Sequence, residues 1–253
     1  MELAHYVMTT LGIAGDVTYR LSKWDPNNKK KYLGDDEYWN STQQYLRDVM
    51  DKNNIPYTEA DDEAAFYGPK IDIQAKNVYG KEDTMVTIQL DCASAENFGM
   101  YYIDEKGEKV RPWIIHRTSM GCYERTLAWL IEHYAGKFPT WLCPEQVRVL
   151  PISEKYADYA EKVRKELAAR DIDVTVDHRS EKIGYKIREA RMDKLPYMLV
   201  VGEQEEKDGL VSVRSRFEGN EGQKTLSEFM DQICEEIRTK AIREELPEDE
   251  KKR

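Results

Sequence analysis

The second half of the 253-residue chain alternates segments that have strand and helix patterns. Residues 197–201 (Tyr-Met-Leu-Val-Val) form a continuous apolar run, as in a strand that is buried on both faces. The order of elements is strand, helix, strand, helix, strand, strand and helix, which indicates an α/β fold around a mostly parallel sheet. We predict strands at 147–152, 173–177, 197–201 and 210–214, and helices at 157–167, 181–194 and 226–237.

The first half has short strand patterns separated by turns, which predicts an antiparallel sheet and an α+β arrangement. Pro139 and Pro144 bracket the seam between the two halves. We therefore expect domains at 1–143 and 144–242, followed by a charge-rich tail at 243–253 that frays. Within the first domain we predict a helix at 36–51, strands at 70–75, 84–90, 100–103 and 113–115, and a helix from Gly121 to Gly136.

Composition excludes several classes of protein. No stretch of 18 apolar residues exists, so no membrane span is predicted, and the N-terminus has no signal-peptide pattern. The four cysteines form no Cys-x-x-Cys pair, which argues against a disulfide framework or a zinc ribbon. A cytoplasmic protein with free thiols is expected. The net charge of -10 argues against general affinity for nucleic acid.

One segment departs from this acidic background. Residues 179–194 hold six basic and three acidic side chains. Such a segment is either an ordinary solvated helix face or a local surface for an anionic partner, and its charge alone does not decide between them.

Three residues stand where they could carry chemistry. Lys70 follows a Tyr-Gly-Pro turn at 67–69, where glycine permits a sharp bend and proline fixes the next dihedral angle. His116 ends an apolar run, and Arg125 opens a helix, where its planar fork suits a phosphate. Taken singly, these are more often a turn lysine, a hydrogen-bonded histidine and an exposed arginine.

Together, the order and spacing of these residues resemble a known family. Residues 121–125 (Gly-Cys-Tyr-Glu-Arg) match the third motif of the class II aminoacyl-tRNA synthetases. Residues 65–72 (Ala-Phe-Tyr-Gly-Pro-Lys-Ile-Asp) and 115–117 (Ile-His-Arg) are similar to runs of the threonyl-tRNA synthetase family. Residues 181–190 and 196–202 resemble its anticodon-binding domain. The resemblance covers about residues 5–242.

The resemblance implies roles for residues of the first domain. Tyr67, Lys70 and Gln89 would act at the threonine and adenylate pocket, and Thr87 would help to bind ATP. Arg125 would contact an ATP phosphate and act in catalysis. His116 would be one of three zinc ligands.

It also implies partners. Arg188, Lys194, Glu205 and Arg214 would read anticodon bases, and the whole enzyme would use ATP with Mg²⁺, threonine and the threonine tRNA. Members of the family form homodimers. Directional hydrogen bonds from such side chains to base edges suit a single-stranded RNA loop.

The pattern is incomplete. The first motif, which forms the dimer, and the second motif, which holds the α-phosphate, are not found. The other two zinc ligands belong to that same region, so we expect this chain to supply one ligand and to be inactive alone. Smaller departures are residues 83–86 (Asp-Thr-Met-Val) in place of Trp-Gln-Cys-Gly, Cys122 in place of serine, and Ser180 in place of asparagine.

Three interpretations stay open. The chain is the C-terminal portion of a threonine–tRNA ligase, a catalytically inactive synthetase-like protein that binds tRNA or a partner, or a small-molecule-binding α/β module. The motifs favour the first, the incomplete pattern is compatible with the second, and only the acidic charge favours the third.

Overall fold

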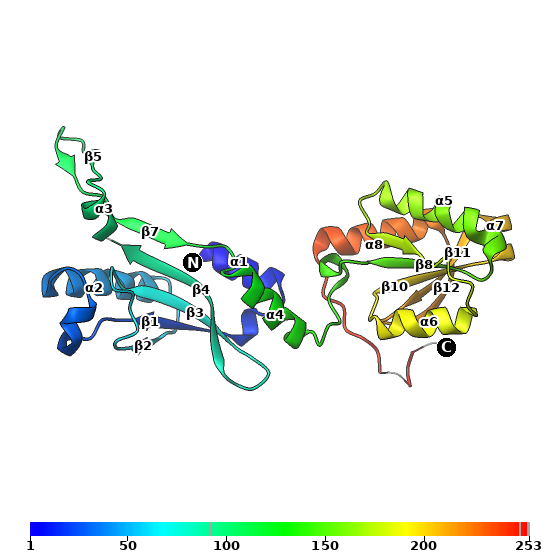
Figure 1. Cartoon of the computed structure of the whole chain (residues 1–253), viewed down its shortest axis with the longest axis horizontal. Coiled ribbons are helices and arrows are strands. Elements are labelled where there is room, and N and C mark those ends of the chain that lie inside the picture. The colour runs from blue at the N-terminus through cyan, green and yellow to red at the C-terminus, as the bar shows by residue number, and fades with distance from the viewer. Residues whose placement is uncertain (92, 248, 252–253) are drawn as a thin grey trace. The chain divides into compact units, whose positions relative to one another are not determined.

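The computed structural model describes residues 1–91, 93–247 and 249–251, and the chain divides into two compact units (Figure 1). Unit 1 is Met1–His133 and unit 2 is Tyr134–Arg253. Each unit has its own sheet. Within the described residues, no helix is both long and apolar enough to cross a membrane.

Unit 1 is built on a five-stranded sheet in the order β2-β1-β3-β4-β7. Its strands pair antiparallel except for β1 and β2, which are parallel. A separate ribbon pairs β5 with β6, so the strand predicted at 100–103 does not join the main sheet. The helices are α1 (Glu2–Thr10), α2 (Asp36–Lys52), α3 (Ala93–Asn97) and α4 (Tyr123–His133); the strands are β1 (Val17–Ser22), β2 (Thr58–Ala60), β3 (Lys70–Lys76), β4 (Glu82–Asp91), β5 (Tyr102–Ile103), β6 (Lys109–Val110) and β7 (Ile114–Arg117).

The two faces of this sheet differ in chemistry. Successive side chains of a strand point to opposite faces. On one face, Leu21, Ile71 and Leu90 pack against Leu46 and Met50 of α2, which runs along the sheet (Figure 1). The alternate positions of the same strands carry polar side chains, so the opposite face of the sheet is polar. This polar face holds Lys70, Thr87, Gln89 and His116 of the predicted site residues.

Unit 2 is built on a five-stranded sheet in the order β12-β11-β10-β8-β9. The strands β8, β9 and β10 are parallel, and β10, β11 and β12 pair antiparallel, so the α/β fold is confirmed and its sheet is mixed. The strands are β8 (Val147–Pro151), β9 (Val174–Val176), β10 (Tyr197–Val201), β11 (Leu210–Ser215) and β12 (Gly219–Thr225); the helices are α5 (Ala157–Ala168), α6 (Ile183–Met192), α7 (Glu203–Asp208) and α8 (Leu226–Thr239).

Helices cover both faces of the sheet in unit 2, with α5 and α8 on one side and α6 on the other (Figure 1). The face toward α5 and α8 carries the larger core, which includes Leu167, Leu199 and Phe229. On the other face, Met198 packs with Ala190 of α6. Burial of these apolar side chains on both faces explains the continuous apolar run at 197–201.

The tail does not fray over its described residues. The Arg243 guanidinium donates to the Tyr197 hydroxyl at 2.6 Å and to the Glu218 carboxylate at 2.6 Å. The Leu246 amide donates to the Phe217 carbonyl at 3.0 Å. Glu245 forms ion pairs inside unit 2 as well. The expectation that this charge-rich tail frays is therefore wrong for these residues, because their partners lie far away in the sequence.

Candidate functional site

Three of the predicted residues form one row across the polar face of unit 1. Lys70 of β3 stands opposite Gln89 of β4, and Gln89 stands opposite His116 of β7. Directly opposite residues of antiparallel strands have Cβ atoms about 5 Å apart on the same face. The register therefore brings together side chains that are 46 positions apart in sequence from first to last.

A second row lies one step further along the same strands. Asp72 stands opposite Thr87, and the Thr87 hydroxyl donates to the Asp72 carboxylate at 2.9 Å. The Ser22 hydroxyl donates to the other carboxylate oxygen at 2.6 Å, and Lys70 Nζ lies 3.1 Å from it. The Asp72 side chain is 0% exposed, so these donors replace its hydration.

Asp72 thereby fixes two of the predicted residues, Lys70 and Thr87. Arg20 of β1 adds positive charge, with Nη2 3.9 Å from the same carboxylate. Sequence reasoning did not select Asp72 or Ser22. The available signal was spacing, because a residue two positions after Lys70 in a strand shares its face.

Tyr67 lies beside the first row. Its hydroxyl donates to the Gln89 side-chain oxygen. Burial, followed by the negative charge of Asp91, raises the pKa of Tyr67, so the phenol remains a neutral donor. The Tyr38 hydroxyl donates to the Tyr67 carbonyl at 2.8 Å and holds the turn from α2.

The turn that carries Tyr67 requires its glycine. A Cβ atom added at Gly68 would lie 1.8 Å from the Leu90 carbonyl oxygen. The Leu90 amide donates to the Pro69 carbonyl at 3.1 Å. Close contact of the two backbones thus sets Tyr67 and Lys70 against β4.

His116 is oriented by a buried carboxylate. Its Nε2 lies 2.8 Å from Asp91 Oδ2, and the Tyr67 ring lies 5.7 Å away, centroid to centroid. Ser94 donates to Asp91 through its amide at 2.9 Å and its hydroxyl at 2.6 Å. Burial alone would raise the pKa of Asp91, but the bonds from Ser94 and His116 outweigh it and lower that pKa.

A zinc site is not complete in this chain as described. The contact with Asp91 occupies Nε2 of His116 and leaves Nδ1 as the nitrogen that could bind a metal. Among the described residues, no three or more His, Cys, Asp or Glu side chains gather where they could hold a metal ion. A catalytic zinc needs three protein ligands, so these residues do not fit one by themselves.

Arg125 lies toward the other end of β4. Its Nη1 donates to the Thr84 carbonyl at 2.8 Å. The helix start is held close to the strand, since a Cβ atom at Gly121 would lie 1.8 Å from the Met85 carbonyl oxygen, and Gly121 has a φ of +75°. Thr84 and Gln89 are five residues apart, roughly 17 Å along a strand. The spacing suits an elongated ligand with an anionic group at the Arg125 end.

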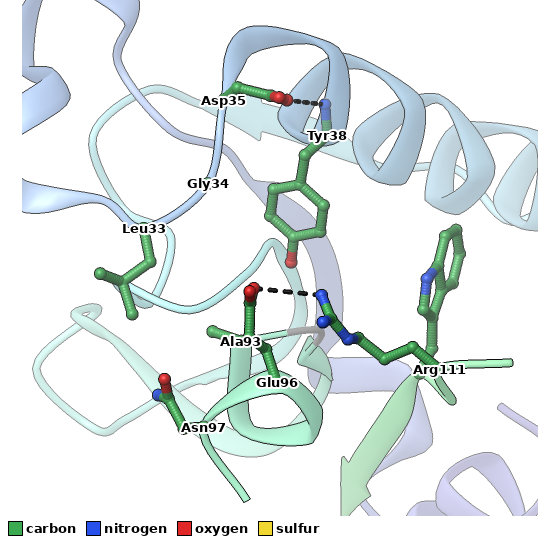
Figure 2. Close-up of a pocket in the computed structure, with 9 residues that line it drawn as sticks. Leu33, Gly34, Asp35, Tyr38, Ala93, Glu96, Asn97 and Arg111 are labelled. Atoms are coloured by element: carbon green, nitrogen blue, oxygen red, sulfur yellow. Dashed lines mark hydrogen bonds and ion pairs between the residues drawn. The ribbon is translucent and has the colours of Figure 1, made fainter. Parts of the chain in front are cut away.

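A separate cavity of about 460 Å³ lies beside the start of α2 (Figure 2). Glu96 and Arg111 form an ion pair of 3.1 Å there, and Asp35 caps α2 by accepting from the Tyr38 amide at 2.8 Å. None of the predicted catalytic residues lines this cavity. Tyr38 lines the cavity and connects it to the predicted site, because its hydroxyl donates to the Tyr67 carbonyl.

In unit 2, Glu205 follows the carboxyl end of β10. Its carboxylate accepts from the Ser212 hydroxyl at 2.7 Å, the Gln223 amide at 2.9 Å and the Gly202 backbone amide at 3.0 Å. Burial opposes ionisation of Glu205, but bonds from Ser212 and Gln223 outweigh it and lower the pKa. Glu205 of α7 is thus a fixed acceptor that lies beside β11 and β12.

Arg214 lies on the α6 face of the sheet, since it stands opposite Met198, which packs on α6. Burial and then the nearby charge of Arg191 lower the pKa of Arg214. No ion pair within the described part of the chain involves Arg188, Arg191 or Arg214, and Arg188 is exposed on α6. Like charges without carboxylate partners are typical of a surface that binds an anion.

Other basic residues of segment 179–194 are already engaged. Arg179 pairs with Asp177 at 2.6 Å. Lys186 is buried and donates to the Asp177 carbonyl at 2.9 Å. Lys194 Nζ donates to the Ala135 carbonyl at 2.5 Å, so the structure turns it toward the start of unit 2. Counting charges therefore overstated the basic surface that α6 offers.

The comparisons with known proteins agree with this division. Residues 2–134 match the family described as tRNA synthetase class II core domain (G, H, P, S and T), and residues 146–236 match the family described as anticodon binding domain. The threonine–tRNA ligase of Clostridium perfringens strain 13 is 62% identical over 237 residues, which cover 94% of this chain and 37% of that protein. The threonine–tRNA ligase of Geobacillus kaustophilus is 48% identical over 229 residues, or 90% of this chain and 35% of that protein.

Solved structures give the same result. The RNA binding domain of threonyl-tRNA synthetase from Cryptosporidium parvum aligns with a TM-score of 0.81 and 35% identity, covering 92% of this chain and 58% of that chain. A putative threonyl-tRNA synthetase from Aeropyrum pernix aligns with a TM-score of 0.72 and 24% identity, covering 97% of this chain and 61% of that chain, which shows the shared fold. The chain thus spans a little over a third of the curated relatives it matches.

Proposed function

Since this chain belongs to the class II tRNA synthetase family, we propose that it serves as part of a threonine–tRNA ligase, which activates threonine with ATP and transfers it to tRNA. The proposal includes ATP with Mg²⁺, threonine and the threonine tRNA as ligands, a homodimeric whole enzyme, and a cytoplasmic location. Zinc belongs to the proposal only for the whole enzyme, because the described residues supply one histidine ligand. By itself, the chain is expected to be inactive.

The observation that carries the proposal is the row of Lys70, Gln89 and His116 on one polar sheet face. Lys70, fixed by the buried Asp72, would meet the negative charge of an adenylate. Tyr67 and Gln89 form a hydrogen-bonded pair that could orient a small polar substrate. Thr87 lies between this pair and the Arg125 end, where a polyphosphate would find a guanidinium.

Unit 2 would hold the RNA. Arg188 and Arg214 form no ion pair within the described residues, and Glu205 is a fixed acceptor for an exocyclic amino group. We keep Lys194 in the proposal as a residue that must leave the Ala135 carbonyl in order to meet RNA.

A chimera tests the catalytic part. This chain replaces the matching segment of the C. perfringens ligase, and threonylation of the threonine tRNA is measured. We expect an active chimera, and Arg125→Ala should lower kcat/KM on the order of 100-fold. Lys70→Ala should lower it as well, whereas the control Lys76→Ala, at the exposed end of β3, should not. A folded chimera without threonylation activity would contradict the proposal.

The RNA part is tested on the chain as it is. Binding is measured to a threonine tRNA transcript and to the same transcript with a changed anticodon, at two salt concentrations. Tighter binding to the natural anticodon supports the proposal. Equal binding to both at either salt concentration would contradict anticodon reading and would favour a chain that reads no RNA.

A further inference from the structure

A small basic pocket in unit 2 is distinct from the residues predicted to read bases, Lys194 apart. It has a volume of about 140 Å³ and lies beside the end of α6 and the turn between β11 and β12. Five cationic residues line it, and one carboxylate, from the tail, lies among them. These residues are Lys137, Arg191, Lys194, Arg216, Lys251 and Glu245.

Arg216 forms the buried wall of this pocket. Its side chain is only 10% exposed. Nη1 donates to the Lys194 carbonyl at 2.6 Å, and Nη2 donates to the Phe138 carbonyl at 2.8 Å. Nε lies 2.7 Å from Glu245 Oε1, yet it is a buried donor without a properly aligned hydrogen bond among the described residues. The buried guanidinium thus keeps one N–H group, at Nε, that makes no well-aligned hydrogen bond to the described residues.

The Glu245 carboxylate forms ion pairs with the cationic residues of this pocket. Its other oxygen lies 2.8 Å from Lys137 Nζ and 3.5 Å from Lys251 Nζ. Its neighbour Leu246 fixes the tail through the Phe217 carbonyl. Among the described residues that line the pocket, Glu245 is set against Lys137, Arg191, Lys194 and Arg216, which leaves an excess of positive charge. Burial lowers the pKa of Arg216, although the negative charge of Glu245 opposes this.

We propose that this pocket is a binding site for a backbone phosphate of RNA, and that Glu245 occupies it as a competitor supplied by the chain's own tail. The inference rests on the proposed RNA function and adds a contact to it. Arg191 provides the continuity, because it lines the pocket and also lies close enough to Arg214 to lower its pKa. RNA held at Arg214 would therefore lie near Arg191, which lines this pocket.

A phosphate matches the cationic groups of this pocket better than a carboxylate does. Its non-bridging oxygens can accept from a guanidinium and from several ammonium groups at once. Exchange of Glu245 for a phosphate also releases the counterions that the phosphate carried, which makes binding depend on salt. Because Glu245 competes for the pocket, the tail lowers the affinity for any RNA that does not place a phosphate there.

The test compares Glu245→Gln with Glu244→Gln, a neighbour that is exposed and carries the same charge. Binding of the full chain to a threonine tRNA transcript is measured between 50 and 200 mM salt. Glu245→Gln should bind roughly threefold tighter or more at the lower salt concentration, and its salt slope should be steeper by about 0.7. Glu244→Gln should follow the unmodified chain. Equal behaviour of the two variants would overturn the proposal.

A second probe separates this proposal from the RNA function itself. Inorganic phosphate is titrated into Glu245→Gln while the Nε–H resonance of Arg216 is followed by NMR. A saturable shift, absent in the unmodified chain, supports the pocket even if tRNA binding fails. Anticodon-dependent tRNA binding without any such shift overturns the pocket and leaves the RNA function standing.

A folding control completes the design. If Glu245→Gln lowers the melting temperature by more than a few degrees, Lys137→Ser serves instead, since Lys137 is half exposed and its loss spares Arg216. That variant should weaken tRNA binding and make the salt slope shallower. Unchanged binding would count against the proposal.

Discussion

The two units build their sites in opposite ways. In unit 1, four of the six candidate residues lie on strands of one sheet, and backbone register decides which of them meet, as for Lys70 and Gln89. In unit 2, the candidates lie on two helices, in the turn after α6 and on the inner strand β11. Side-chain partners decide which of them remain available, as for Lys194 and Arg214. A sequence motif is therefore a better guide to geometry in the first case than in the second, because register is set by the backbone.

The largest effect is expected from a change at the backbone contact between Gly68 and Leu90, which positions the site residues of unit 1. Gly68→Ala places a Cβ atom where the Leu90 carbonyl oxygen lies, so β3 and β4 must separate. We expect a loss of about 3 kcal/mol or more in the stability of unit 1, measured by denaturant unfolding.

The control for this change lies in unit 2. Gly184 stands in α6 with open space around it, so Gly184→Ala should stabilise unit 2 by up to about 1 kcal/mol. Equal changes in stability for the two glycine substitutions would show that the close backbone contact at Gly68 does not hold β3 against β4.

The buried carboxylate of unit 1 gives the next effect. Asp72→Asn removes the charge that compensates Lys70 and leaves one hydroxyl without its ionic acceptor. We expect a cost of about 2 to 3 kcal/mol, and the double variant with Lys70→Met should recover part of it. A double-mutant cycle without coupling between Asp72 and Lys70 would show that Asp72 does not position the lysine.

Much of the fold was predictable from the sequence. Apolar periodicity located α2, β3, β4 and the parallel strands of unit 2, because burial of one face imposes that pattern. The strand β12 (Gly219–Thr225) was missed, since it has no apolar residues and exists through its pairing with β11. The short helix α7 (Glu203–Asp208) was missed for the same reason, because none of its residues is buried.

The sites were predictable only in part. The motif located Tyr67 and Arg125, but not what holds them, because those partners lie 22 to 41 positions away. The interaction between His116 and Asp91 joins two strands, and no local sequence pattern predicts it. In unit 2, three of the six basic residues of 179–194 have internal partners that charge counting cannot show.

A substitution in unit 2 separates stability from binding. Arg214→Gln removes a partly buried charge beside Arg191, so the stability of unit 2 should stay level or rise slightly. Binding to the threonine tRNA transcript should weaken by about 1 to 2 kcal/mol if Arg214 meets a base. The control is Arg238→Gln, an exposed arginine paired with Glu235 on α8, which should leave RNA binding unchanged. A loss of stability with intact RNA binding would make Arg214 a structural residue.

The smallest effect is a pH dependence in unit 1. The guanidinium of Arg47, with help from Lys23, lowers the pKa of Glu59 to about 2 although burial opposes this, and the triad fixes β2 to α2. Because the folded-state pKa lies below the ordinary value of 4.5, this contribution is present above pH 4.5 and is lost as the pH falls toward 2. Glu59 is about a third exposed, so solvent screening reduces the contribution to about 1 kcal/mol. Stability measured between pH 6 and pH 3 should depend less on pH in Glu59→Gln than in the control Glu105→Gln, and identical profiles would show that the triad does not stabilise unit 1.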